Sequence, residues 1–320
     1  MVSSLCKENG IHCYKIYIDL VKAYDKVNQE VLWMILERKG VPDKLLNLIK
    51  ATMIGSKARV NIEGKLSDPF FLKCGLKQGS VISPLLFNIF FGAIIEEIEK
   101  RTKGLGLKLM FKIGGDIFDI SSIKKKKDKD LIIVEIWNML FADDAELCSD
   151  SKENLQVIVS IFNEVVSALG QEISCKKTEV VVTDTKNEKK CSASISVDNY
   201  ELSVVTKFRY LGVTENSESN MKNELAQRIF KTRSNFSKYK VAVFNNRDLN
   251  YKIILSNYKV LILSTLLYAC ETWVISGDEM KTLEVLQKEF LKKILRVKDY
   301  MNKVSYLDLL MLASKYEKFY

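Results

Sequence analysis

An apolar segment at residues 137–142 ends in two adjacent aspartates, Asp143 and Asp144, and this feature constrains the fold more than any other. Such a segment is typical of a β-strand, and here it delivers two carboxylates into a tight turn with no basic residue beside them. Placing like charges together costs stability, and a divalent cation between them would remove that cost. An Asp-Asp pair also occurs as an ordinary solvated turn, so the pair alone leaves both interpretations open.

A second acidic strand end lies far upstream. Residues 14–20 alternate polar and apolar side chains and are rich in β-branched and aromatic types, which predicts a strand that ends near Asp19. If the two strands are antiparallel neighbours, Asp19 and Asp143 meet at one edge of a sheet. Carboxylates arranged in this way hold Mg²⁺ ions on phosphate oxygens, which suits phosphoryl transfer by in-line displacement. The sequence places no histidine beside either motif, so metalloprotease and histidine-based acid–base sites find no support.

Charge and cysteine usage bound the partners and the compartment. Lys and Arg total 49 against 40 for Asp and Glu, and the net charge of +9 permits a polyanionic partner without requiring one. Seven scattered cysteines without a Cys-x-x-Cys pair argue against a zinc site or a disulfide framework. The two longest apolar stretches, 81–95 and 260–273, fall short of the roughly 20 residues that span a bilayer. We therefore expect buried helices at both stretches, no membrane partner, and an intracellular protein, nuclear or cytoplasmic and not secreted.

The texture of the sequence changes at a Ser/Asn/Glu-rich linker, residues 216–220. Before it, expected strands alternate with expected helices, among them helices that begin after Asn28 and at Ser83. After it, the apolar spacing is almost entirely helical. This pattern predicts an α+β domain over residues 1–216 and a helical region over residues 217–320.

Several motifs in order resemble the reverse transcriptases of non-LTR (LINE-type) retrotransposons, the RTE-like branch among them. The first three are residues 19–27 (Asp-Leu-Val-Lys-Ala-Tyr-Asp-Lys-Val), 75–88 (Gly-Leu-Lys-Gln-Gly-Ser-Val-Ile-Ser-Pro-Leu-Leu-Phe-Asn) and 141–144 (Phe-Ala-Asp-Asp). Residues 208–213 (Phe-Arg-Tyr-Leu-Gly-Val) resemble the primer-grip hairpin of that family, and residues 268–273 (Tyr-Ala-Cys-Glu-Thr-Trp) resemble a recurrent thumb helix. The likeness covers nearly the whole chain.

The resemblance implies a fold and a reaction. It implies a right-hand polymerase core, with an antiparallel sheet and helices forming the palm and partial fingers over residues 1–216, followed by a helical thumb or connection region. The implied activity is RNA-directed DNA polymerase. In that reaction a DNA primer 3′-hydroxyl attacks the α-phosphate of a dNTP on an RNA template, with two Mg²⁺ ions as cofactors and Mn²⁺ as the alternative. The oligomeric state is not indicated.

The same resemblance assigns the catalytic residues. Asp19 and Asp143 would ligate the metal ions together with the Leu20 carbonyl, and Asp144 would support the second ion. Tyr24 would lie under the incoming sugar, where an aromatic ring excludes a 2′-hydroxyl by contact. A core aromatic is the alternative for Tyr24.

Nucleotide and primer contacts follow in the same way. Gln78 and Gly79 would approach the templating base pair, although an ordinary glycine turn before a helix has the same pattern. Lys177 would approach the leaving pyrophosphate, and a plain surface lysine is the alternative. A tight hairpin at Tyr210, Leu211 and Gly212 would hold the primer end, or would be a simple strand turn.

A second function stays open beside the polymerase. The family carries a fingers region ahead of its first catalytic strand, and few residues precede that strand here, so we expect the nucleotide clamp not to be encoded in this chain. The alternative is a catalytically inactive retrotransposon remnant that at most binds RNA or an RNA–DNA hybrid. A nucleotidyl cyclase-like palm is disfavoured by Gln78-Gly79 and by the hairpin at 210–212.

Overall fold

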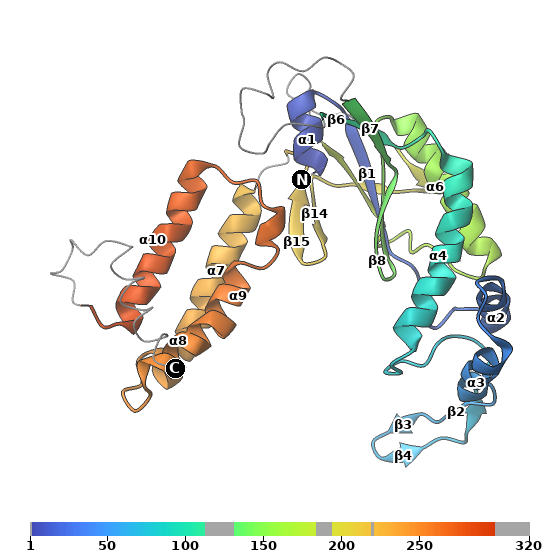
Figure 1. Ribbon diagram of the computed structural model, residues 1–320, viewed down its shortest axis with the longest axis horizontal. Coiled ribbons are helices and arrows are strands. Elements are labelled where there is room, and N and C mark those ends of the chain that lie inside the picture. The colour runs from blue at the N-terminus through green and yellow to red at the C-terminus, as the bar shows by residue number, and fades with distance from the viewer. Residues whose placement is uncertain (1, 113–130, 184–193, 219–220, 298–320) are drawn as a thin grey trace. The chain divides into compact units, whose positions relative to one another are not determined.

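The computed structural model describes residues 2–112, 131–183, 194–218 and 221–297 (Figure 1). Its contacts divide the chain into two compact units, Cys6–Phe208 on one side and Met1–Leu5 with Arg209–Tyr320 on the other. The boundary between Phe208 and Arg209 falls inside a β-strand and precedes the linker that the sequence indicates at residues 216–220. The expected domain limits of 1–216 and 217–320 stay predictions.

The first unit is built around a five-stranded sheet in the order β13-β10-β1-β9-β8. Its strands are β1 (Cys13–Ile18), β8 (Asn138–Phe141), β9 (Asp144–Ser149), β10 (Glu179–Thr183) and β13 (Ser203–Val204). Strand β1 lies in the centre and pairs antiparallel with both β9 and β10. All but one of its residues are buried, because helices cover one face of the sheet and Phe208 stacks on Tyr17 at the other.

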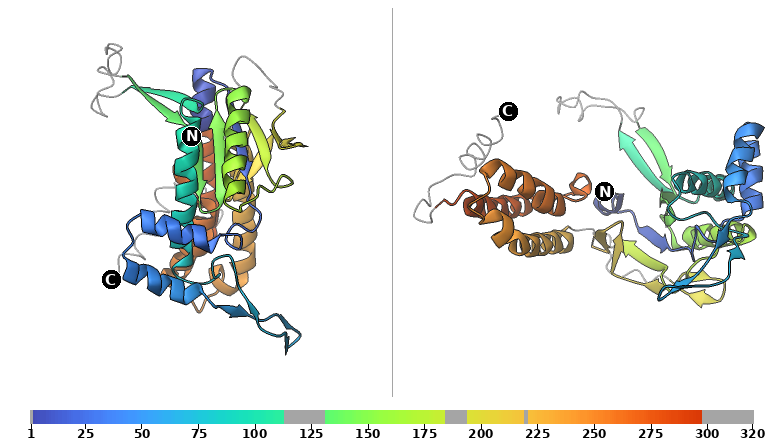
Figure 2. Two further views of the ribbon diagram at one scale, coloured as in Figure 1. Left: turned by 90° about the vertical axis from the view of Figure 1, so that its right-hand side faces the viewer. Right: turned by 90° about the horizontal axis from the view of Figure 1, so that it is seen from below.

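Helices cover one face of this sheet. Helix α4 (Ser83–Thr102) lies beside α6 (Lys152–Ala168), and α6 packs on β9, as Figures 1 and 2 show. Phe87, Phe90 and Phe162 are fully buried in the core that these helices form. The buried helix expected near residues 81–95 is therefore confirmed as α4.

Two further helices pack at one end of α4. Helix α2 (Gln29–Arg38) begins at Asn28, whose side chain accepts hydrogen bonds from the N–H groups of Glu30 and Val31, as its residue type predicts. Helix α3 (Asp43–Met53) contacts α2. The remaining elements are short: α1 (Val2–Asn9), β2 (Lys57–Ala58), β3 (Asn61–Ile62), β4 (Lys65–Leu66), β5 (Phe70–Phe71), β6 (Leu107–Lys112), β7 (Leu131–Ile136), β11 (Ser196–Val197) and β12 (Tyr200–Glu201).

The second unit is a helical bundle joined to a hairpin. Its elements are β14 (Lys207–Tyr210), β15 (Val213–Asn216), α7 (Lys222–Tyr239), α8 (Tyr251–Asn257), α9 (Ser264–Leu266) and α10 (Gly277–Ile294), with π-helical turns at Lys240–Phe244 and Tyr258–Leu263 and a 3₁₀ turn at Cys270–Thr272. Its core contains a stack of aromatic rings, in which the Phe236 centroid lies 4.5 Å from Phe244 and 4.4 Å from Phe290. The helical pattern expected after residue 221 is present through residue 297.

One helical stretch in this unit, Tyr251–Thr272, is long and apolar enough to cross a membrane by length and composition, with a mean hydropathy of 1.6. A core helix of a folded domain passes the same test, and Ile254, Tyr258 and Ile262 of this stretch are buried in the bundle. Only 28% of the apolar window is buried, so the buried helix expected at 260–273 is present in part. The absence of a membrane partner stays a prediction.

Candidate active site

The two adjacent aspartates lie at a two-residue hairpin turn. Strands β8 and β9 pair antiparallel up to Phe141 and Asp144, which leaves Ala142 and Asp143 as the loop. Ala142 has φ = 55°, the positive value that a tight hairpin of this length requires at its first loop position. Asp143 is therefore at the tip of the turn, and Asp144 opens the strand that follows it.

Asp19 lies next to this turn because of the strand register. Ile18 pairs with Ala145, so one step further along the antiparallel ladder Asp19 comes opposite Asp144. Residues directly opposite each other share a face of the sheet. The sequence predicted that the acidic strand ends meet if the strand before Asp143 is the antiparallel neighbour of the strand before Asp19. That neighbour relation is wrong, because β9, the strand after the turn, lies between β1 and β8. The acidic ends still come together, through the pairing of β1 with β9.

The electrostatics of this edge reflect three acidic groups. The pKa of Asp144 is raised above its usual value, mainly by burial and further by the negative charges of Asp143 and Asp19. The pKa of Tyr24 is raised by burial and further by the negative charge of Asp143. The phenol is therefore close enough to the acidic edge to interact with it. A cation at this edge would relieve the repulsion.

The donor atoms suit a hard divalent cation, because they are all oxygens. The backbone carbonyl of Leu20 stays a predicted additional ligand. The backbone bonds on either side of it run from Ser174 N–H to the Asp19 carbonyl and from Val21 N–H to the Glu172 carbonyl, both 2.8 Å. That pairing leaves the Leu20 carbonyl out. Within residues 2–112, 131–183, 194–218 and 221–297, no three His, Cys, Asp or Glu side chains already have the spacing of a metal site.

Lys177 forms an ion pair with the acidic edge. Its Nζ lies 3.3 Å from Asp19 Oδ2, and its side chain is 71% exposed. The turn that carries it is fixed by hydrogen bonds from Lys177 N–H and Thr178 N–H to the Ser174 carbonyl. The ammonium therefore lies beside a predicted metal ligand, its exposure also fits a plain surface lysine, and its approach to the pyrophosphate stays a prediction.

Tyr24 stacks on a core helix and also faces the site. Its ring centroid lies 4.3 Å from that of Phe87 on α4, with the planes 16° apart. Its carbonyl accepts a hydrogen bond from Leu76 N–H at 2.9 Å, which joins the turn after β1 to the segment before α4. The stack supports the core-aromatic interpretation of this half-buried ring, and its contact with the incoming sugar stays a prediction.

The loop that carries Gln78 and Gly79 is anchored at Gly75. Gly75 N–H donates to the Val27 carbonyl at 2.8 Å, and the Gln29 side chain donates to the Gly75 carbonyl at 2.9 Å. Gln78 and Gly79 themselves are exposed, and nothing in the chain lies within 4 Å of a Cβ built on Gly79. The loop therefore presents open backbone at that position.

Gly75→Ala should lower the free energy of unfolding by about 2–4 kcal/mol, the sum of a left-handed backbone penalty and a steric clash. Gly75 has φ = +82°, and an added Cβ would lie 2.7 Å from the Asp25 carbonyl oxygen. Gly55→Ala is the matched control, because Gly55 has φ = +74° with open space around it and should lose only about 1–2 kcal/mol. Urea unfolding measures both variants, and equal losses would contradict the clash.

The segment at 210–212 forms the tight hairpin that the sequence predicted. Leu211 and Gly212 both have positive φ, 47° and 81°, which is the signature of a type I′ turn between β14 and β15. This turn belongs to the helical unit, whereas the carboxylates belong to the sheet unit. Each group is therefore described within its own unit.

Sequence analysis missed two buried ion pairs. Lys15 Nζ lies 2.7 Å from Glu146 Oε1 inside the sheet unit, and Arg228 Nε lies 2.5 Å from Glu224 Oε1 inside the helical unit. The second pair has an i, i+4 spacing that could have been noticed on a helix. The first has no such signal, because a lysine in an alternating strand usually faces solvent.

Comparison with known proteins identifies the family of the chain. Residues 2–215 match the family model described as reverse transcriptase (RNA-dependent DNA polymerase). The chain is 23% identical over 208 residues to the Pol polyprotein of the type-2 retrotransposable element R2DM of Drosophila melanogaster, covering 63% of this chain and 17% of that protein. It is 25% identical over 288 residues to the RNA-directed DNA polymerase from the mobile element jockey of Drosophila funebris, covering 89% and 28%. The chain thus spans less than a third of these relatives.

A solved telomerase from Candida tropicalis, in complex with a fragment of telomeric RNA, is similar at a TM-score of 0.45 and 14% identity, covering 99% of this chain and 49% of that one. That score is too low to carry an argument. The family match spans most of the chain. The sheet with its covering helices forms the palm of a right-hand polymerase, in the α+β class that the sequence predicted. The chain belongs to the reverse transcriptase family, as a reverse transcriptase domain of the non-LTR retrotransposon type.

Proposed function

We propose that this chain supplies the catalytic palm and the thumb of an RNA-directed DNA polymerase that extends a DNA primer on an RNA template. The observation that carries the proposal is the register of β1 against β9, which brings Asp19 beside the Asp143-Asp144 turn. Three carboxylates at one sheet edge, in a family defined by this reaction, support two-metal nucleotidyl transfer.

In this mechanism the carboxylates of Asp19 and Asp143 and the Leu20 carbonyl hold the metal, and Asp144 supports them. When bound, two Mg²⁺ ions, or Mn²⁺, would stabilise charge on the entering and leaving oxygens of the displacement. Lys177 leaves Asp19 for the phosphates of the incoming dNTP and neutralises the departing pyrophosphate. This exchange suits a long exposed side chain that needs only to swing a few bonds.

The remaining assigned residues orient the substrates. Tyr24 supports the sugar of the dNTP, and the open backbone at Gln78 and Gly79 lets the templating base pair approach closely. The turn at Tyr210, Leu211 and Gly212 holds the primer end. Each role is a matter of contact geometry, since none of these groups needs to accept or release a proton.

Metal-dependent primer extension tests the proposal. Purified chain, an RNA template with an annealed DNA primer and dNTPs should give extended product with Mg²⁺, and chelation of the metal should abolish it. Folded protein that gives no extension with either Mg²⁺ or Mn²⁺ would contradict autonomous polymerase activity of this chain and favour the non-catalytic candidate. A template made of DNA, run in parallel, measures the preference for RNA.

The second candidate is a non-catalytic protein that binds RNA or an RNA–DNA hybrid. It is favoured by the excess of basic residues, 49 against 40 acidic. Binding without extension would support it. Its six described cysteines have free thiols, which supports an intracellular location, nuclear or cytoplasmic, as part of either proposal.

Tyr24→Ala should raise ribonucleotide incorporation relative to deoxynucleotide incorporation by at least roughly tenfold, because the ring that would contact a 2′-hydroxyl is gone. Tyr24→Phe keeps the ring and its stack on Phe87, and it should keep the preference. Single-nucleotide extension with matched dNTP and rNTP measures the ratio. If Tyr24→Ala loses stability but leaves the ratio unchanged, Tyr24 is a packing residue only.

A further inference from the structure

The hairpin turn at Leu211 and Gly212 is held by one side chain from α7 and one from the turn that follows α9. Tyr268 Oη donates a hydrogen bond to the Leu211 carbonyl at 2.9 Å, and Arg228 Nη2 donates to the Gly212 carbonyl at 2.6 Å. Both backbone carbonyls of the turn thus have a fixed partner. Turn carbonyls of a two-residue hairpin ordinarily face solvent, so this arrangement asks for an explanation.

A third residue completes the arrangement. Glu224 accepts a hydrogen bond from Thr214 N–H at 2.8 Å through Oε2 and from Arg228 Nε at 2.5 Å through Oε1. Glu224 and Arg228 are 1% and 6% exposed. We call Glu224, Arg228 and Tyr268 the hairpin clamp. All three residues lie in the helical unit with the turn that they bind.

The clamp is also internally braced. The Arg228 guanidinium lies 4.6 Å from the centroid of the Tyr268 ring, within the range of a cation–π contact. The same ring covers Gly212, where an added Cβ would lie 3.3 Å from the Tyr268 Cε1 and Oη atoms. A hydrogen bond from Asn235 Nδ2 to Thr265 Oγ1, at 3.0 Å, ties α7 to α9 close to Tyr268.

Packing alone does not account for the clamp. A buried ion pair contributes no more stability than apolar side chains of the same size, because both charges lose their water. The ion pair and the tyrosine instead fix the orientation of the turn. They hold the carbonyls of Leu211 and Gly212 and the N–H of Thr214 in place relative to the helices. The clamp also joins residues 208–213 and 268–273, two segments that the sequence singles out separately and that lie far apart in the chain.

We propose that Arg228 and Tyr268 are positioning residues for the primer terminus, acting through the backbone of the hairpin turn that they hold. The inference rests on the proposed function, in which that turn holds the primer end. The turn then moves as part of the helical unit, and the primer 3′-hydroxyl is presented by a rigid element. A loosened turn presents that hydroxyl in the reactive position less often, while the dNTP contacts stay as they are.

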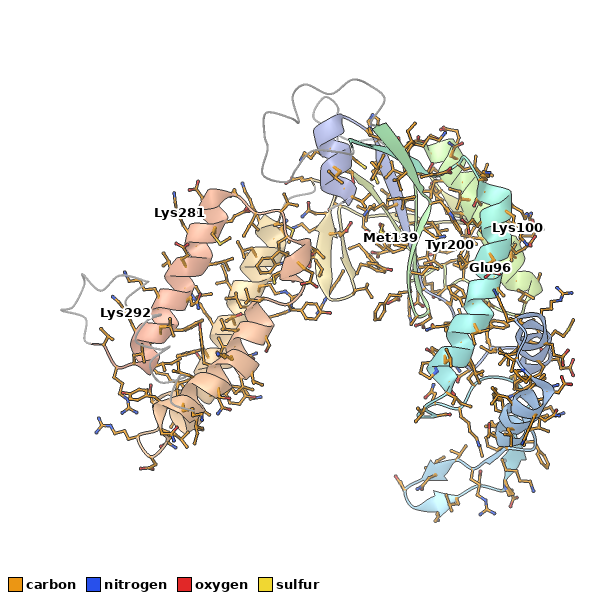
Figure 3. The ribbon with its side chains drawn as sticks, in the orientation of Figure 1. Glu96, Lys100, Met139, Tyr200, Lys281 and Lys292 are labelled. Atoms are coloured by element: carbon orange, nitrogen blue, oxygen red, sulfur yellow. The ribbon has the colours of Figure 1, made fainter. Side chains whose placement is uncertain are left out.

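Tyr268→Phe is the sharpest test, because it removes one hydroxyl from a half-exposed ring and leaves the ring over Gly212. Amide hydrogen exchange of residues 209–216 should become roughly two- to tenfold faster, as expected for the loss of one hydrogen bond. The efficiency kcat/KM for primer–template should fall by a similar factor, while KM for dNTP stays unchanged. Tyr200→Phe is the control, because Tyr200 is half-exposed on β12 of the sheet unit (Figure 3). Removal of its hydroxyl should change neither the exchange rate nor kcat/KM.

Arg228→Lys is the second variant, since a lysine can pair with Glu224 but cannot also donate to the Gly212 carbonyl. It should reproduce the faster exchange. Because Arg228 is buried and stacked on Tyr268, a loss of overall stability is expected as well, and urea unfolding measures it separately. Unchanged exchange in Tyr268→Phe would overturn the clamp. Equal effects on primer–template and dNTP parameters would overturn the positioning role.

If the chain has no polymerase activity, the proposed function fails, but the positioning role can still be tested without catalysis. In that case, a primer with a photoreactive 3′-terminal nucleotide reports the contact directly. Crosslinking to residues 209–216 that falls in Tyr268→Phe but not in Tyr200→Phe supports the positioning role. Crosslinking that is the same in both variants, or absent from the hairpin of the unaltered protein, overturns it.

Discussion

Primer extension by Asp143→Asn falls at least about a hundredfold below that of the unaltered chain, the cost of removing a group that stabilises charge in the transition state. Asparagine keeps the shape of the side chain and the hairpin turn between β8 and β9, but it loses the negative charge that would hold a divalent cation. Asp19→Asn should give a comparable loss, because Asp19 lies opposite Asp144 in the same ladder. Extension rates at saturating Mg²⁺ measure both.

Stability should move in the opposite direction. The pKa of Asp144 is raised in the folded protein by burial and by its acidic neighbours, so the folded state binds that proton more tightly than the unfolded chain. The ionised group therefore lowers stability above its folded pKa, and stability is recovered as the pH falls through that value. Asp143→Asn removes one of the repelling charges and should unfold at the same or a higher urea concentration. Loss of extension then reports chemistry, not misfolding.

Asp150→Asn is the control for these variants. Asp150 follows the opposite end of β9, away from the acidic edge, and its substitution should leave extension within about twofold of the unaltered chain, as for a surface change. Extension that survives Asp143→Asn, or that falls equally in Asp150→Asn, would remove the acidic edge from the mechanism.

Much of this edge could be predicted because it depends on local patterns. Alternation over residues 14–20 and the apolar run before Asp143 each specify a strand, and each strand ends in a carboxylate. Asn28 specifies a helix start through its side-chain cap, and Pro84 marks the first turn of α4. The remaining step, which strands are neighbours, did not follow from the sequence: the strand before Asp143 is β8, whereas the neighbour of β1 is β9, the strand after the turn.

What the sequence could not predict depends on contacts between distant segments. The hairpin at 210–212 has the turn residues of any tight hairpin, and nothing local to it indicates that its carbonyls bind Arg228 and Tyr268. The burial of Lys15 is harder still to predict. In an alternating strand it reads as solvent-facing, but β1 is central in its sheet and the second face is covered too, for example by the stack of Phe208 on Tyr17 at 4.3 Å.

The buried pair of Lys15 and Glu146 gives the largest expected effect on stability. Their side chains are 1% and 3% exposed, and Nζ lies 2.7 Å from Oε1. Lys15→Met leaves a carboxylate buried without its cation, which should lower the free energy of unfolding by about 3–5 kcal/mol. The double variant Lys15→Met, Glu146→Leu removes both charges and should recover most of that loss, since well-packed apolar residues replace a buried pair at little cost.

A double-mutant cycle in urea, with Glu146→Leu as the other single variant, separates the pair from its surroundings. Lys100→Met is the control, because Lys100 forms an exposed pair with Glu97 on α4 at 3.1 Å (Figure 3) and should cost at most about 1 kcal/mol. If the losses of Lys15→Met and Glu146→Leu simply add in the double variant, the two charges do not stabilise each other. Strong coupling at Lys15 and none at Lys100 would show that the buried pair of Lys15 and Glu146 stabilises β1, the strand that leads to Asp19. The polar and apolar alternation of that strand does not predict such a pair.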